Sequence, residues 1–73
     1  MLFGDFLEKV TFSVVQDIRV IIKVSDWVMN DETLYDRIGI DENYITLAML
    51  RYSVEKVYIE GGYVVIYLHD DSI

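Results

Sequence analysis

The sequence predicts a single α+β domain over residues 1–73, in which an N-terminal helix packs on an antiparallel sheet of about four strands. A short helix is expected between two hairpins. Three observations predict this fold: an apolar stripe with helical spacing at the start of the chain, alternating apolar and polar residues over 18–25, and a Gly-Gly pair between two apolar runs near the end. A chain of 73 residues without a linker or a repeat has the length of one domain.

The first segment predicts the N-terminal helix. Its apolar residues recur at positions i, i+3, i+4 and i+7, which places one stripe of side chains on a helix: Phe3, Phe6, Leu7 and Val10. So short a helix is not stable alone, so we expect the stripe to dock on the sheet. The next residues, 11–15 (TFSVV), fit either a last helical turn or an irregular connection.

The middle of the chain predicts a hairpin followed by a short helix. Residues 16–27 alternate in polarity as a strand does, with one face made of Ile18, Val20, Ile22 and Val24. Asn and Asp in residues 29–32 favour a turn, and residues 33–40 predict the returning strand. Residues 41–53 then predict one or two turns of helix that begin near Asp41.

The last segment predicts a hairpin that is apolar on both faces. Gly61 and Gly62 favour a two-residue turn, which sets Glu60 opposite Tyr63 and fixes every other cross-strand pair. One face is then aliphatic, and we expect it to lie against the N-terminal helix: Val57, Ile59, Val64, Ile66 and Leu68. The other face is mainly aromatic and is left without a cover: Val54, Tyr58, Tyr63, Val65 and Tyr67.

The composition narrows the class of partner. Thirteen acidic side chains against six basic ones give a net charge of −7, which argues against direct binding of nucleic acid and of anionic membranes. Hydrophobic residues make up 53% of the chain, and a small domain has little interior, so we expect the excess to be buried in an assembly. The first residues lack the basic region of a signal peptide, and no run of about 18 apolar residues is present, so we expect a cytoplasmic protein.

The residues that could carry chemistry do not form a catalytic pattern. His69 is the only histidine, no cysteine is present, and no serine lies in a G-x-S-x-G setting. The adjacent carboxylates lack the spacing of a calcium loop, and no glycine-rich loop precedes a helix as in a phosphate site. We therefore expect no catalytic residue, no metal and no cofactor, and a protein that is not an enzyme.

Two groups of residues are candidate interaction sites. An acidic segment could imitate phosphates and engage a host protein with a basic surface, or could simply keep the chain soluble: Asp31, Glu32, Asp36, Asp41 and Glu42. The second group is aromatic, and aromatic residues are enriched at the centres of protein interfaces: Trp27, Tyr58, Tyr63, Val65 and Tyr67.

Four stretches of the sequence, GDFLEKV, DIRVIIKV, ETLYDRIG and SVEKVYIEGGYVVIYL, resemble a group of short acidic proteins encoded by phages and prophages of Gram-positive bacteria. The resemblance implies an α+β fold and a phage context, and it assigns no catalytic residue. The longer SDWVMND connection and the proline-free DENYITLAML segment depart from the pattern of the group.

These observations together predict a non-enzymatic interaction protein that forms a homo-oligomer. A phage-encoded modulator or inhibitor of a host protein would fit the acidic charge and the resemblance. The alternative is a protein that binds a small ligand in a pocket formed between subunits, because aromatic side chains also line such pockets.

Overall fold

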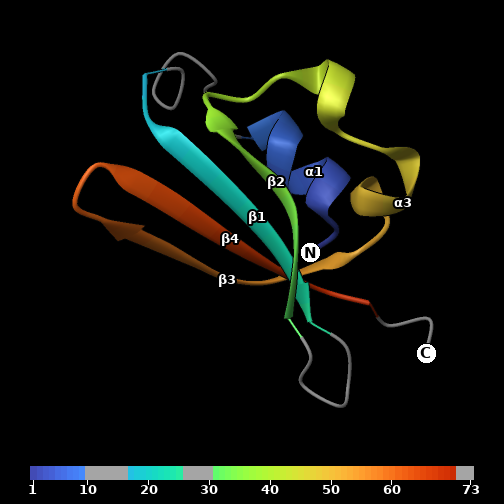
Figure 1. Ribbon diagram of the computed structural model, residues 1–73. Helices are drawn as coiled ribbons and strands as arrows, with labels where there is room; N and C mark the ends of the chain where they lie inside the picture. The colour runs from blue at the N-terminus through green and yellow to red at the C-terminus, as the bar shows by residue number, and fades with distance from the viewer. Residues whose placement is uncertain (10–16, 26–30, 71–73) are drawn as a thin grey trace.

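The computed structural model describes residues 1–9, 17–25 and 31–70. Figure 1 shows the helical segments packed beside one sheet, with the elements in the following order: α1 (Phe3–Lys9), β1 (Arg19–Ser25), β2 (Asp31–Ile38), the 3-10 helix η1 (Glu42–Tyr44), α3 (Leu47–Leu50), β3 (Ser53–Glu60) and β4 (Tyr63–His69). The described chain is thus an α+β fold with an N-terminal helix and four strands, as predicted. None of the described helices is long and apolar enough to cross a membrane.

The sheet is mixed, and the prediction of a wholly antiparallel sheet is wrong. The strand order is β2-β1-β4-β3, with antiparallel pairing within each hairpin and parallel pairing between β1 and β4. The two central strands, RVIIKVS and YVVIYLH, carry apolar residues on both faces, whereas the edge strands, DETLYDRI and SVEKVYIE, carry more charges. Central strands are buried on both sides by their neighbours, so the more apolar pair occupies the centre.

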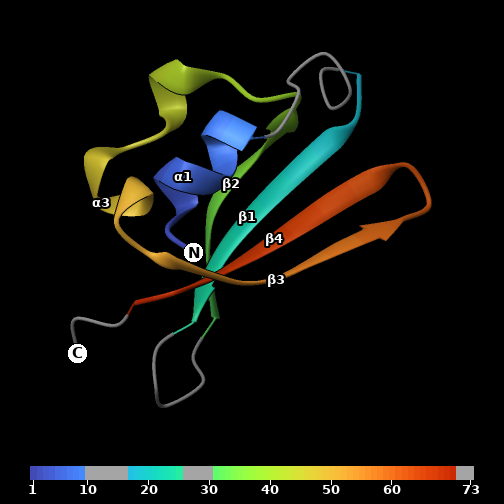
Figure 2. The same cartoon turned by 180° about the vertical axis from the view of Figure 1, so that it is seen from behind.

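The helical segments lie on one face of the sheet, as the two opposite views in Figures 1 and 2 show. Between this layer and the sheet lies the core: Phe3, Val20, Ile22, Tyr35, Met49, Val64, Ile66 and Leu68. The alternation predicted for residues 18–25 is confirmed, because Val20 and Ile22 are buried while Arg19 is exposed. The face of the sheet away from the helices has no covering element among the described residues.

Helix α1 docks through the predicted stripe. Phe3 is fully buried and stacks on Phe6, with 6.3 Å between the ring centroids. The backbone N–H of Phe3 donates to the carbonyl of Tyr52 at 2.8 Å, which ties the start of the chain to the start of β3. Val10, the segment 11–15 and the first part of the predicted turn at 29–32 lie outside the described residues.

The predicted helix in residues 41–53 is two short helices. Asp41 caps η1 by accepting a hydrogen bond from the backbone N–H of Asn43, and Thr46 caps α3 by accepting one from Met49. Ile45 between them has an extended backbone. Because Thr46 begins a new helix directly after Ile45, η1 ends after one turn.

The final hairpin has the predicted register, with one correction. Glu60 pairs with Tyr63 and Lys56 with Tyr67, and both glycines of the turn have positive φ, 42° at Gly61 and 94° at Gly62. Val54, predicted on the aromatic face, packs against the core instead. A bulge between Val54 and Lys56 inserts one unpaired residue, which reverses the face that the preceding residues take.

The expected cover of the aliphatic face is incomplete. Val64, Ile66 and Leu68 are buried, but Val57 is 38% and Ile59 is 78% exposed. Figure 1 shows the tip of the β3–β4 hairpin projecting beyond the helical layer. The helix layer therefore covers the central strands and leaves the end of the edge strand β3 open.

Candidate interaction surfaces

The sheet face without helices is the first candidate surface, and we call it the open face. Its members follow from the strand register, since paired residues share a face. They are Arg19, Ile21, Lys23 and Ser25 of β1, Asp31, Thr33, Asp36 and Ile38 of β2, Ser53, Lys56, Tyr58 and Glu60 of β3, and Tyr63, Val65, Tyr67 and His69 of β4. Glu55, the extra residue of the bulge, joins this face because its carboxylate accepts a hydrogen bond from the Ser25 hydroxyl at 3.3 Å.

The tyrosine cluster, defined as Tyr58, Tyr63, Val65 and Tyr67, occupies one half of the open face. The rings of Tyr58 and Tyr67 meet edge to face with 5.7 Å between centroids. The Lys56 ammonium lies 5.4 Å and 5.0 Å from these two centroids, and a hydrogen bond with Tyr58 raises the pKa of Lys56 above its ordinary value. The four members and Glu60 line a hollow of about 240 Å³.

The cluster is held in place by its neighbours. Val65 is nearly buried, whereas Tyr58 remains 45% exposed. The Tyr63 hydroxyl donates to the Glu60 carboxylate at 3.2 Å. Contacts with neighbouring side chains therefore hold the rings on the sheet while Tyr58 stays exposed and Tyr63 and Tyr67 stay partly exposed, which is an arrangement that suits interface anchors.

The open face is almost neutral although the chain is strongly acidic. It holds three of the six basic side chains and four of the thirteen acidic ones, so the rest of the sequence holds three basic and nine acidic side chains. Arg19 binds Asp36 through two hydrogen bonds of 2.7 Å and 2.6 Å. These bonds lower the pKa of Asp36 below its ordinary value and raise the pKa of Arg19.

The structure separates most of the residues of the acidic segment. Asp31 and Glu32 begin β2, whereas Asp41 and Glu42 follow the other end of that strand. Asp36 lies on the open face and is paired with Arg19. Trp27, the remaining member of the predicted aromatic group, lies outside the described residues.

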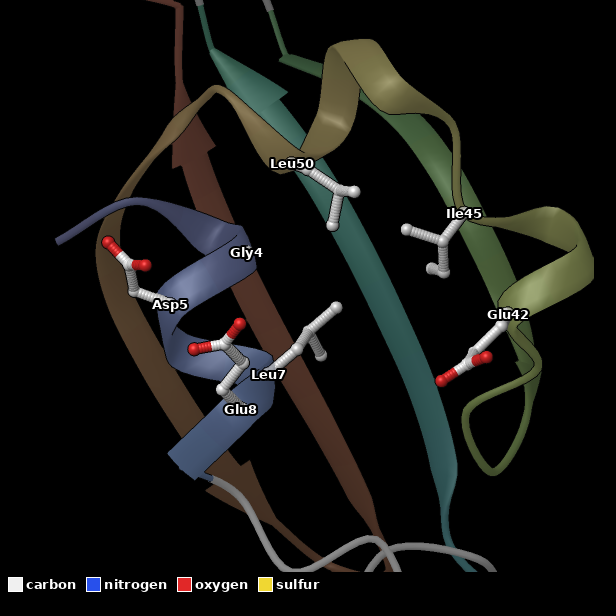
Figure 3. A pocket seen from close by; sticks show the side chains of 7 residues that line it. All are labelled: Gly4, Asp5, Leu7, Glu8, Glu42, Ile45 and Leu50. Carbon is white, nitrogen blue, oxygen red and sulfur yellow. The ribbon is translucent and has the colours of Figure 1, made fainter.

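A groove between α1 and the η1–α3 segment is a second candidate surface. It has a volume of about 430 Å³ and is shown in Figure 3, where seven residues line it: Gly4, Asp5, Leu7, Glu8, Glu42, Ile45 and Leu50. The apolar side chains of Leu7, Ile45 and Leu50 point toward the space between the two walls. A Cβ atom on Gly4 would lie 3.4 Å from the carbonyl oxygen of Leu50, an ordinary van der Waals distance, so α1 and α3 approach each other closely at this point.

Sequence reasoning missed this groove. Asp5 and Glu8 lie beside the apolar stripe of α1, so the helical period of the sequence predicts the acidic wall on α1. Glu42 comes from the other wall, more than thirty residues along the chain, and only the tertiary structure brings it near α1. The hydroxyl of Tyr35 helps to place that wall, since it donates to the carbonyl of Gly39 at 2.6 Å and accepts from the N–H of Asp41 at 2.9 Å.

Comparison with known proteins assigns no role to the open face or to the groove. No protein-family model, curated protein or solved structure matches the chain. Among the described residues, no group of three His, Cys, Asp or Glu side chains is placed to hold a metal ion. Functional inference therefore rests on the geometry of the open face and of the groove.

Proposed function

We propose that this protein is a non-enzymatic interaction module that self-associates through the open face. The tyrosine cluster on a sheet face that no described helix covers is the single observation that carries the proposal. Ordered aromatic side chains around an almost buried aliphatic residue resemble the centre of a protein interface. The occupant of the face is a second copy of this chain.

The charge distribution supports a second copy over an unlike partner. Two copies of a protein with a net charge of −7 repel each other unless the contacting surfaces are close to neutral. The open face meets that condition, with its three basic and four acidic side chains. Basic and acidic side chains on one face can also pair across a two-fold axis, because a basic residue of one copy can then meet an acidic residue of the other copy.

The size of the face sets the expected affinity. Strands of seven residues in a four-stranded sheet span about 23 Å by 19 Å, or roughly 450 Å² per copy. Standard stable interfaces bury about 800 Å² per partner, and smaller ones are weak and transient. We therefore expect a reversible dimer with a dissociation constant of about 1–100 µM.

Sedimentation velocity with two neighbouring substitutions tests the proposal. Tyr58 and Ile59 are adjacent on β3 and both exposed, but they lie on opposite faces of the sheet. Tyr58→Glu introduces a charge into the proposed contact, so the dissociation constant should rise at least about tenfold. Ile59→Glu adds the same charge on the other face and should leave self-association unchanged.

A third variant excludes local compensation. A glutamate at position 58 could pair with Lys56, which would reduce the effect of Tyr58→Glu. Tyr67→Lys cannot be compensated in this way, because it places a second ammonium group beside Lys56, and it should also release monomers. Circular dichroism of each variant must match the parent. A parent chain that remains monomeric at about 100 µM, the weak end of the expected range, would refute the proposal.

A ligand site between subunits is the second candidate function, favoured by the hollow of about 240 Å³ within the tyrosine cluster. Aromatic walls and one carboxylate, that of Glu60, suit a small planar ligand that carries a hydrogen-bond donor. A second copy would close this hollow. A ligand of this kind would strengthen dimerisation, since binding to one state shifts the equilibrium toward it.

A phage context is part of the proposal, and it is supported by the resemblance to short acidic phage proteins stated above. A phage-encoded modulator of a host protein needs a recognition surface and no catalytic centre. The proposed dimer would display two acidic outer surfaces to a host protein with a basic surface. Capture of one host protein by the parent chain that weakens steeply as the salt concentration rises would support this context, because contacts between opposite charges are screened by salt.

A further inference from the structure

The groove between α1 and η1–α3 combines apolar side chains with acidic residues on both of its walls. Leu7, Ile45 and Leu50 form the interior, and three carboxylates line the groove: Asp5, Glu8 and Glu42. No basic side chain is among the lining residues. In Figure 3 the carboxylates come from both walls, with Asp5 and Glu8 on α1 and Glu42 opposite them.

None of these carboxylates forms an ion pair with a described residue, whereas Arg19 pairs with Asp36 on the opposite face of the sheet. The segments outside the described residues contain no lysine or arginine. Lys9, next to Glu8 at the end of α1, is the nearest basic residue to Asp5 and Glu8 along the chain and forms no ion pair with them. The three carboxylates are therefore available to cationic groups of another molecule.

The apolar interior extends beyond the groove. A second hollow of about 170 Å³ is lined only by apolar residues: Phe6, Leu7, Val20, Ile40, Val57, Ile59, Val64 and Ile66. Leu7 lines both hollows, so they adjoin each other at this side chain. Apolar lining residues are therefore found on both sides of Leu7, from Leu50 on α3 to the exposed Ile59 on β3, and we call the two adjoining hollows the track.

We propose that this groove binds a basic amphipathic segment of a partner protein. The apolar side chains of such a segment would fill the track, and its lysines or arginines would pair with Asp5, Glu8 and Glu42. A single metal ion would not explain the apolar track. This site is separate from the open face, so the inference does not depend on self-association.

Titration with a synthetic peptide tests the site by NMR. The probe is a leucine–lysine peptide of about 15 residues with leucine at every third or fourth position, and the control is a scrambled peptide of the same composition. The amphipathic probe should shift the resonances of Leu7, Ile45 and Leu50 in a saturable manner. The scrambled peptide should bind at least about tenfold more weakly, because it cannot present one apolar face.

Two double variants that remove the same charge distinguish peptide binding in the groove from general attraction between the acidic protein and the basic peptide. Glu8→Gln combined with Glu42→Gln should weaken probe binding about five- to twentyfold, since each exposed ion pair contributes about two- to fivefold in affinity. Asp31→Asn combined with Glu32→Gln removes the same charge at two residues outside both hollows and should change affinity less than about twofold.

Three results would overturn the proposal. Equal weakening by the two double variants would show that the attraction is diffuse. Peptide-induced shifts confined to the open face would assign binding to the other surface. Shifts of Leu7, Ile45 and Leu50 on dilution without peptide would make the groove a contact between copies of this chain.

Discussion

Removal of the Phe3 side chain should strongly destabilise the fold. Phe3 is fully buried, stacks on Phe6, and anchors α1 where its N–H donates to Tyr52. Truncation of a buried phenylalanine to alanine costs about 3–5 kcal/mol. A domain of 73 residues has a total stability of about 4–11 kcal/mol. Phe3→Ala should therefore remove between about a quarter and all of the free energy of unfolding.

Urea denaturation followed by circular dichroism measures this loss. Phe6 is only partly buried and packs at the margin of the core, so Phe6→Ala serves as the graded comparison, with an expected cost of about 1–3 kcal/mol. Phe3→Ala should also lower the melting temperature by more than about 12 °C. A loss below about 1 kcal/mol for Phe3→Ala would refute the docking of α1 described above.

Three further predictions concern the elements that carry the two surfaces. Tyr35→Phe removes both hydrogen bonds of a buried hydroxyl and should cost about 1–3 kcal/mol in urea denaturation, with chemical shift changes spreading to η1. Gly62→Val forces a β-branched residue to a φ of 94° and should destabilise the hairpin by about 1–2 kcal/mol, whereas Gly61→Asn, at 42°, should melt close to the parent. In an NMR titration Arg19→Gln should return the lowered pKa of Asp36 toward its ordinary value. A lowered carboxyl pKa stabilises the fold at pH values above the ordinary pKa of the group. The contribution of the Arg19–Asp36 pair should therefore vanish as the pH falls through the lowered pKa of Asp36.

Local patterns predicted the parts of the fold that depend on neighbouring residues. The Gly61-Gly62 turn set the register of the last hairpin, since a two-residue turn leaves one pairing. The alternation over residues 18–25 predicted which side chains of β1 are buried. The apolar stripe placed Phe3 in the core because its helical period has one consistent face.

Features that depend on competition between distant segments were not predicted. Parallel pairing of β1 with β4 follows from which strands are apolar on both faces, a comparison across the whole sheet. The bulge before Lys56 places Val54 on the core face. The pairing of β3 with β4, and not the local sequence of β3, decides where the extra residue is inserted. The groove needed Glu42 beside α1, which requires the tertiary fold.

The central claim is that two copies meet through the tyrosine cluster, and isotope-filtered NMR of a mixed sample tests it most directly. Half of the molecules carry ¹³C and half do not, so filtered NOE signals arise only between copies. The account predicts NOEs from the methyl groups of Val65 in one copy to the tyrosine rings of the other, at concentrations where sedimentation shows a dimer. Intermolecular NOEs that arise instead from Ile59 or Leu47, both on the helix-bearing side of the molecule, would contradict it.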